Sequence, residues 1–174
     1  IQAAKMSYES VFISSLIGNV KVSDALTQNP ITIRSNATIQ IAAREYFMKH
    51  PYKGYPVVKA LTNGNISNNE TKEQPKEEAK YTVIGFVTLN DLLSIRKKEW
   101  ETVNLEELIN RKKLKWYKTE PDTEAKQALI LMNESGVSSL MVMEGSKLVG
   151  IVCHHDIMNI VDVRLALEEK VEKE

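Results

Sequence analysis

The chain is poor in cysteine, in long apolar runs and in excess charge, and each shortage excludes a class of protein. One cysteine among 174 residues excludes an internal disulfide and fits a reducing compartment. No apolar run approaches the ~20 residues that cross a bilayer, and the sequence contains no signal peptide. The 23 basic residues balance the 23 acidic ones, so no overall field attracts nucleic acid or a membrane.

Catalytic and metal-binding motifs are missing as well. The sequence has neither a His-Glu-x-x-His motif nor a Gly-x-x-x-x-Gly-Lys phosphate loop. His154, His155 and Asp156 are adjacent, but adjacent residues at a helix start point in different directions and do not favour a metal site. Cys153 has no His–Asp partner set, so we expect a small buried residue and not a nucleophile. The sequence predicts neither an enzyme nor a metal site in this chain.

One short motif occurs twice, and the rest of the chain is organised around it. The copies run from Gly85 to Asp91 and from Gly150 to Asp156, each with a glycine, a strand-like apolar run and a final Asp before an apolar helical run. Unpaired N–H groups and the helix dipole at such a position suit a phosphate. The carboxylate beside them can accept two hydrogen bonds from a ribose diol.

A second interpretation of the motif is purely structural. Thr88 and Asp91 also fit a capping box, in which the threonine caps the helix and the acid reaches back. In the second copy Cys153, a poor cap, replaces the threonine, yet Asp156 keeps its place. The second copy therefore favours a ligand role for Asp156.

The motif belongs to a longer internal repeat. Residues 118–123 match 33–38, and residues 137–142 match 52–57, so Thr38 and Thr123 lie 85 positions apart. Asp91 and Asp156 lie only 65 positions apart, and the difference of 20 fits a polar loop in the first copy against a tight turn at 144–147 in the second. Each repeat predicts the order β-α-β-β-α. One such unit has too little core to stand alone, so we expect an α+β fold of two repeats related by a pseudo-twofold, packed sheet against sheet with clefts between them.

The repeat sets the expected organisation of the chain. We expect a connector helix over residues 1–20, a first repeat over 21–99, a second over 100–163 and a charged helix end over 164–174. Residues 60–80 are polar and predict a solvated insertion that joins two strands as a hairpin.

The order of these motifs resembles the cystathionine-β-synthase (CBS) domain pair, also called a Bateman module. The resemblance rests on residues 22–26 and 55–58 and on the two Gly-x-x-[Thr/Cys]-x-x-Asp turns, and it covers about residues 20–163. Such pairs commonly bind adenine nucleotides or related adenosyl ligands and regulate a neighbouring domain. The resemblance implies a regulatory module that binds AMP, ADP or ATP, forms a twofold homodimer and has no catalytic residues.

Family knowledge also implies composite sites, each with residues from both repeats. The first cleft takes Asp156, Cys153 and His155 with Ile31, Tyr52 and Lys53; the second takes Asp91, Thr88 and Phe86 with Trp116, Val137 and Ser138. This sequence departs from the family pattern at three places. Cys153 stands where Thr or Ser is usual, Trp116 is bulky for an adenine wall, and residues 140–142 lack the expected proline. These departures leave open whether both clefts bind.

A narrower resemblance concerns the flanking segments. Residues 8–22 and 98–103 are similar to the segments around the CBS tail of site-2-protease-type membrane zinc metallopeptidases. The resemblance implies that this chain is the cytosolic tail of such a protein, with zinc only in an upstream membrane-embedded domain. The first residue is Ile and not Met, which agrees with a piece of a longer protein.

Two rival functions belong to other classes. The chain would be a structural dimerisation module if its clefts were vestigial. A measurement of nucleotide binding distinguishes this function from that of a regulatory ligand-binding module. The basic and aromatic residues 111–118 would bind the phosphates of a ligand, a nucleic acid or a headgroup surface. We expect this cluster to be a solvated run beside a buried tryptophan, and nucleic acid is not an expected partner.

Overall fold

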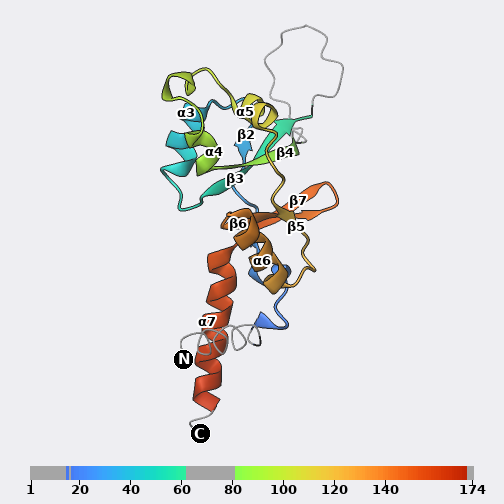
Figure 1. The fold of residues 1–174 in the computed structure, drawn as a ribbon. Helices are drawn as coiled ribbons and strands as arrows, with labels where there is room; N and C mark the ends of the chain where they lie inside the picture. Colours follow the sequence, from blue (N-terminus) through green and yellow to red (C-terminus); the bar gives the residue numbers. More distant parts are fainter. Residues whose placement is uncertain (1–14, 16, 62–80, 172–174) are drawn as a thin grey trace, which may run out of the picture. The chain divides into compact units, whose positions relative to one another are not determined.

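The computed structural model describes residues 15, 17–61 and 81–171, with side chains as far as residue 167, and contains two compact units (Figure 1). Unit 1 comprises Ile1–Pro30 and Trp116–Glu174, and unit 2 comprises Ile31–Lys115. None of the helices in this described part is both long and apolar enough to cross a bilayer. Most of the connector helix predicted over 1–20 and most of the polar insertion lie outside the described residues, at 1–14, 16 and 62–80.

Unit 2 is built on a three-stranded sheet with the order β2-β3-β4. Strand β2 runs parallel to β3, and β3 pairs antiparallel with β4. The elements in chain order are β2 (Ile33–Arg34), α3 (Ile39–Ile41), the π-helical turn η1 (Ala42–Phe47), β3 (Gly54–Ala60), β4 (Tyr81–Thr88), α4 (Leu89–Leu93), the 3-10 turn η2 (Lys97–Glu99) and α5 (Leu105–Lys112). Helix α3 begins where the Thr38 side chain accepts a hydrogen bond from the backbone N–H of Ile41.

Unit 1 repeats this plan on a four-stranded sheet with the order β1-β7-β6-β5. Strands β5 and β6 are parallel, whereas β6 and β7 form an antiparallel hairpin. The elements are α2 (Val22–Ala25), β1 (Thr27–Gln28), β5 (Lys118–Thr119), α6 (Ala125–Ser135), β6 (Ser139–Glu144), β7 (Lys147–Cys153) and α7 (His154–Val171). Helix α6 ends at Gly136, whose φ of 67° is the left-handed conformation that glycine adopts without strain.

The predicted α+β fold and its β-α-β-β-α order are confirmed in both units. The expected hairpin joins β3 to β4, and a bulge follows Val57 in β3 just as one follows Val142 in β6. Helix α7 continues to Val171, so residues 164–171 are helical, and the rest of the predicted helix end lies outside the described residues. The repeats predicted at 21–99 and 100–163 are stretches of sequence, and their boundaries stay a prediction.

The segment before each repeat packs on the other repeat. The backbone N–H of Ala125 donates to the carbonyl of Val20 at 2.8 Å, and that of Ile39 donates to the carbonyl of Val103 at 3.0 Å. The residues around Val20 therefore belong to unit 1, although they precede the first repeat. Residues 103–115 belong to unit 2, although the sequence analysis assigned them to the beginning of the second repeat.

The two repeats thus exchange their leading segments, and the composition of the two cores shows this exchange. The core of unit 2 takes Val103, Leu105, Leu108 and Ile109, which are at most 8% exposed, from the segment of α5. The core of unit 1 takes Ile17, Val20, Val22 and Ala25, which are at most 9% exposed, from the segment of α2. Burial of apolar surface contributes about 25 cal/mol per Å², so these segments stabilise the unit on which they pack.

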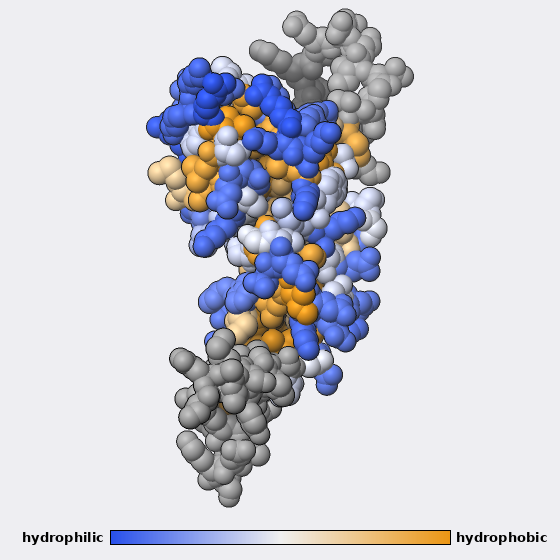
Figure 2. All heavy atoms as spheres, viewed as in Figure 1, coloured by the Kyte–Doolittle hydropathy of each residue, from blue (hydrophilic) through white to orange (hydrophobic). Residues whose placement is uncertain are grey.

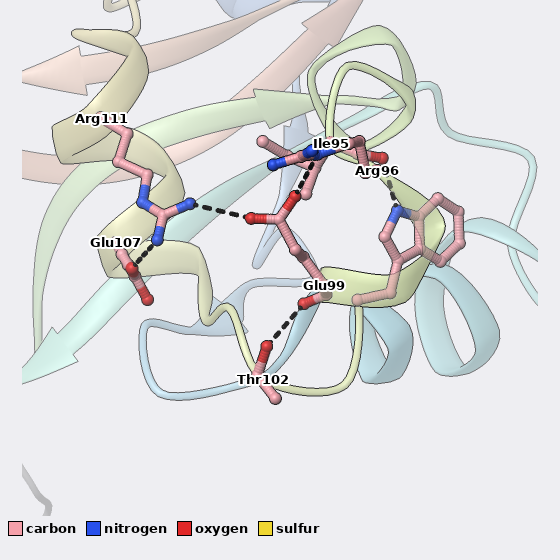
Figure 3. A network of polar contacts seen from close by, with 7 residues as sticks. Ile95, Arg96, Glu99, Thr102, Glu107 and Arg111 are labelled. Carbon is pink, nitrogen blue, oxygen red and sulfur yellow. Dashed lines mark hydrogen bonds and ion pairs between the residues drawn. The ribbon is translucent and has the colours of Figure 1, made fainter.

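A polar network ties the segment between the repeats to α5 (Figure 3). The Glu99 carboxylate accepts a hydrogen bond from Arg96 Nε at 3.0 Å and pairs with Arg111 Nη1 at 3.5 Å, and Arg111 also pairs with Glu107. Trp100 Nε1 donates to the carbonyl of Ile95 at 2.9 Å. The Arg96 hydrogen bond lowers the pKa of Glu99. Exposed pairs of this kind contribute little energy each, so the network orients the segment more than it stabilises the unit.

The predicted match of residues 137–142 with 52–57 agrees with the strand pairing, because Val57 pairs with Gly85 and Val142 with Gly150. The first strand of the repeat and the helix start after it differ by one residue from the sequence alignment. Ile33 pairs with Val57, and Thr119 pairs with Val142, so Thr119 is the counterpart of Ile33 at an offset of 86. The predicted equivalence of Thr38 with Thr123 was wrong. Glu124 is the residue that precedes α6, and it forms no side-chain cap.

Apolar side chains remain on the surface of each unit. On the face drawn in Figure 2 they form patches among hydrophilic residues. The large apolar residues that are at least 45% exposed in unit 2 are Ile41, Met48, Leu61 and Leu93, and those in unit 1 are Ile130, Val163 and Leu167. Ile157 and Ile160 of α7 pack against the core of unit 1 and are not part of these patches.

Candidate ligand-binding site

Asp91 completes the capping box at the start of α4. Its Oδ2 accepts hydrogen bonds from the Thr88 backbone N–H at 2.7 Å and from the Thr88 hydroxyl at 2.6 Å. Thr88 Oγ1 in turn accepts from the Asp91 backbone N–H at 3.3 Å. The structural interpretation of the first motif is therefore confirmed, because both reciprocal bonds are present.

Asp156 occupies the equivalent place at the start of α7. Although Cys153 replaces the threonine, its backbone N–H still donates to Asp156 Oδ2 at 3.3 Å. One half of the capping box therefore persists at Asp156 without the threonine, and its predicted ligand role stays a prediction. Both aspartates are partly exposed. The backbone N–H bonds to the two carboxylates reach Oδ2, and the Cys153 thiol also forms a hydrogen bond with the Asp156 carboxylate.

The length of α7 distinguishes the second motif from the first. Helix α7 spans 18 residues, whereas α4 spans 5. The partial positive charge at a helix start comes from aligned peptide dipoles and from unpaired N–H groups of the first turn. The start of α7 is thus the better place for a phosphate, with Asp156 beside it for hydroxyl groups.

The thiol of Cys153 is half-buried at the end of β7. Burial and the nearby Asp156 carboxylate together raise its pKa to about 12, although a hydrogen bond with Ser139 acts in the opposite direction. A thiol with this pKa is protonated at neutral pH. Cys153 is therefore a small packing residue beside Asp156 and not a nucleophile, because only the thiolate is nucleophilic.

Cys153 should react slowly with iodoacetamide in the folded protein. At pH 8 the folded thiol is almost entirely protonated, whereas an unperturbed cysteine with a pKa near 8.5 is partly ionised. The rate of alkylation, followed by mass spectrometry, should rise with pH well beyond 9. In denaturant the same cysteine should react at the ordinary rate. Equal rates for the folded and unfolded chains at pH 8 would contradict this assignment.

The beginning of the middle strand lies beside each helix start. In unit 2 the Leu89 backbone N–H donates to the carbonyl of Lys53 at 3.1 Å, and in unit 1 that of His154 donates to the carbonyl of Ser138 at 2.9 Å. The structure therefore brings Tyr52 and Lys53 together with Thr88 and Asp91. It likewise brings Val137 and Ser138 together with Cys153 and Asp156.

Each unit thus carries residues from both predicted clefts. Unit 2 holds the predicted residues Ile31, Tyr52, Lys53, Phe86, Thr88 and Asp91, and unit 1 holds Trp116, Val137, Ser138, Cys153, His155 and Asp156. The assignment of these residues to two composite clefts stays a prediction.

The exposure of the predicted residues decides what their side chains can contact. Phe86 is fully buried with its ring over Gly54, where an added Cβ would lie 2.4 Å from ring atom Cε1. Lys53, Ser138 and His155 are exposed. Trp116 is 44% exposed, so the expectation of a buried tryptophan in the basic run was wrong.

An aromatic cluster that the sequence analysis missed supports the segment of Tyr52. Fully buried Tyr55 packs edge-on against Tyr52 with ring centroids 6.0 Å apart, and also against Tyr46 and Phe47. Its hydroxyl donates to the carbonyl of Tyr46 at 3.2 Å, and burial raises its pKa to about 12. The signal available in the sequence was the number of aromatic residues over 46–55.

Metal binding finds no support in the described residues. No group of three or more His, Cys, Asp or Glu side chains in that part of the chain is placed to hold an ion. The adjacent His154 and His155 are both exposed at the first turn of α7.

Comparison with known proteins gives the family. The CBS domain family matches twice, at residues 22–67 and at residues 117–162. The chain belongs to the CBS domain family. The two matches confirm the pair of CBS domains that the repeat predicted, and a CBS domain pair is a regulatory module and not a catalytic one.

Solved CBS structures share the fold. A CBS-domain protein from Agrobacterium tumefaciens is 16% identical, covers 80% of this chain and 92% of its own, and has a TM-score of 0.60. A CBS domain pair in complex with 5′-methylthioadenosine and S-adenosyl-L-methionine is 21% identical over 83% of this chain and 98% of its own, with a TM-score of 0.58. The CBS domain of a bacterial CNNM/CorC family Mg2+ transporter in complex with ATP is 14% identical over 93% of this chain and 98% of its own, with a TM-score of 0.57.

One relative extends the comparison beyond the CBS pair. A zinc metalloprotease of Methanocaldococcus jannaschii is 26% identical over 168 residues, which cover 97% of this chain. The chain spans 40% of the length of that relative.

Proposed function

We propose that this CBS pair is a regulatory module that binds an adenine nucleotide or another adenosyl ligand at the start of α7. The observation that carries the proposal is the partly exposed Asp156 carboxylate at the first turn of an 18-residue helix. Asp156 accepts hydrogen bonds from the ribose hydroxyls, and the first-turn N–H groups receive a phosphate or another anionic group. Solved CBS domains in complex with ATP and with two adenosyl compounds support this ligand class.

The regulatory part of the proposal follows from linkage. A ligand shifts the module between two conformations only by as much as its affinity differs between them. That difference is the free energy available to an attached domain, typically 1–3 kcal/mol. The proposal therefore requires binding near the ligand's cellular concentration and a change in the attached domain when the site is filled.

Isothermal titration calorimetry tests the binding. The chain is titrated with AMP, ADP, ATP, S-adenosylmethionine and 5′-methylthioadenosine, with GTP as a matched non-adenine control. We expect saturable binding of at least one adenosyl compound and weaker binding of GTP. No saturable heat with any of the five at millimolar concentration would contradict the proposal and favour a structural module with vestigial clefts.

We propose further that the parent protein is a membrane-embedded zinc metalloprotease and that this CBS pair faces the cytosol. The similarity to a zinc metalloprotease over nearly the whole chain supports this assignment. The complete reading frame should then encode upstream apolar spans of ~20 residues, one of them with His-Glu-x-x-His, which places two zinc ligands on one helical face. A frame without these features would contradict the assignment and leave the CBS pair intact.

The proposed homodimer uses the exposed apolar residues of α7. Val163 and Leu167 are 59% and 61% exposed at positions four apart, so they share one face of the helix. Exposed apolar side chains in such a stripe favour a partner surface. Light scattering at micromolar concentration should give a dimer mass, and the double variant Val163→Asp, Leu167→Asp should give a monomer. The matched variant Asp162→Asn, on the same helix, should remain dimeric.

A further inference from the structure

The connection between α5 and β5 carries a charge that the fold does not require. Residues 111–118 contain five basic residues and no acidic one. The corresponding connection before β2, residues 26–32, contains no charged residue and leads into the same kind of strand. The first copy of this connection therefore forms without charged residues.

Part of the basic cluster has a structural explanation, and part has none. Arg111 pairs with Glu99 and Glu107, and Lys112 lies in the last turn of α5, where a cation is favourable to the helix dipole. Lys113, Lys115 and Lys118 lie beyond that turn and are exposed. In the described part of the chain, none of these three lysines forms an ion pair with a carboxylate.

The backbone conformation of Lys113 is also unusual for a lysine. Lys113 caps the end of α5 in the left-handed region, with φ of 48° and ψ of 50°. Glycine or asparagine fits this conformation with less strain, and asparagine is the residue at the positive φ of the other connection, at Asn29. The backbone conformation therefore does not explain why a lysine stands at this position.

Trp116 adds an apolar group to the same segment. Its side chain is 44% exposed, and Lys118 Nζ lies 6.0 Å from the centre of its ring. An exposed indole between lysines matches a membrane interface, where tryptophan rings lie at the level of the headgroups and lysines attract anionic lipids. A single-stranded nucleic acid is matched instead by a groove with several stacking aromatics.

We propose that residues 113–118 form a docking site for an anionic phospholipid surface. Lys113, Lys115 and Lys118 attract the lipid phosphates and carboxylates, and the Trp116 indole inserts at the headgroup level. Because the chain as a whole has a net charge of zero, the attraction is local to this segment. The proposal is independent of the ligand site at Asp156 and of the identity of the parent protein.

Sedimentation with lipid vesicles tests the site. The intact chain should bind vesicles of 70% phosphatidylcholine and 30% phosphatidylserine, and not vesicles of phosphatidylcholine alone, with binding that weakens as NaCl rises from 50 to 300 mM. The triple variant Lys113→Gln, Lys115→Gln, Lys118→Gln should lower the partition coefficient at least tenfold. The matched triple variant Lys98→Gln, Lys126→Gln, Lys147→Gln, which removes the same charge from exposed lysines elsewhere, should bind like the parent chain.

Two further variants separate binding from folding. Lys113→Asn should raise the melting temperature by relieving the left-handed backbone and should weaken vesicle binding several-fold. Trp116→Phe should abolish the blue shift of tryptophan emission on adding anionic vesicles, although Trp100 still fluoresces. Any one of three results would overturn the proposal. They are an equal loss of vesicle binding in the two triple variants, vesicle binding that does not depend on phosphatidylserine, and tighter binding to a single-stranded oligonucleotide than to vesicles.

Discussion

Replacement of Asp156 by alanine should weaken binding of the adenosyl ligand by about 1.5–3 kcal/mol, which is roughly 10–150-fold in Kd. This is the loss expected when a charged hydrogen-bond partner is removed. The side chain is partly exposed and accepts hydrogen bonds from the backbone N–H and the thiol of Cys153. The chain should remain folded, because loss of half a capping box costs on the order of 1 kcal/mol. Calorimetry with the tightest of the adenosyl compounds measures the change.

A pair of asparagine variants separates binding from helix capping. In Asp156→Asn the amide oxygen still accepts from the Cys153 N–H, so the cap survives while the charge is lost. Asp91→Asn is the matched change at the first motif, where the aspartate also bonds to the Thr88 hydroxyl. If the start of α7 is the main site, Asp156→Asn should weaken binding more than Asp91→Asn. Unchanged affinity in both Asp156 variants would contradict the proposed site.

The repeated motif was predictable because its signals are local. A glycine, an apolar strand and an acid before an apolar helix fix the path of the chain over a few residues, and both copies have that path. The capping box at Thr88 followed from residue types at a fixed spacing. Half a cap at Asp156 was missed because the donor is the backbone N–H of Cys153, which any residue but proline would supply.

The register of the second repeat was harder to predict. Side-chain identity aligned Thr123 with Thr38, but backbone pairing decides the register, and it aligns Glu124 with Thr38. Backbone hydrogen bonds from Val22 to Thr123 and from Leu105 to Ala37 occupy equivalent places and show the same shift. The shared threonine at one position is weaker evidence for an alignment than the pairing register of the strands, because the register decides on which face of the sheet every side chain lies.

The exchange of segments between the units had no signal in the sequence. The spacing of Leu105, Leu108 and Ile109 predicts a buried helical face, because residues three and four apart share one side. The periodicity of apolar residues predicts that one face of a helix is buried, but it does not predict the sheet on which that face packs. Only the contacts of α5 with β4 and of α2 with α7 identify the partners.

The exchange predicts that a fragment cut at the unit boundaries folds and one cut at the repeat boundaries does not. Residues 31–115 contain the whole core of unit 2, including α5. Residues 21–99 lack Val103, Leu105, Leu108 and Ile109 and expose Val22 and Ala25, which pack in unit 1. Each fully buried aliphatic side chain contributes about 1.5–3 kcal/mol, so four together approach the 5–15 kcal/mol that stabilises a typical domain.

Thermal unfolding followed by circular dichroism distinguishes the two fragments. Residues 31–115 should give a cooperative transition, whereas residues 21–99 should show little structure and bind a hydrophobic dye. In the intact chain, Leu105→Ala should destabilise unit 2 by about 2–5 kcal/mol, because the side chain is fully buried. Leu93→Ala, at a position 60% exposed, is the matched control and should change stability by less than about 0.5 kcal/mol. A cooperative transition for residues 21–99, with none for 31–115, would show that each repeat folds on its own preceding segment and would contradict the exchange.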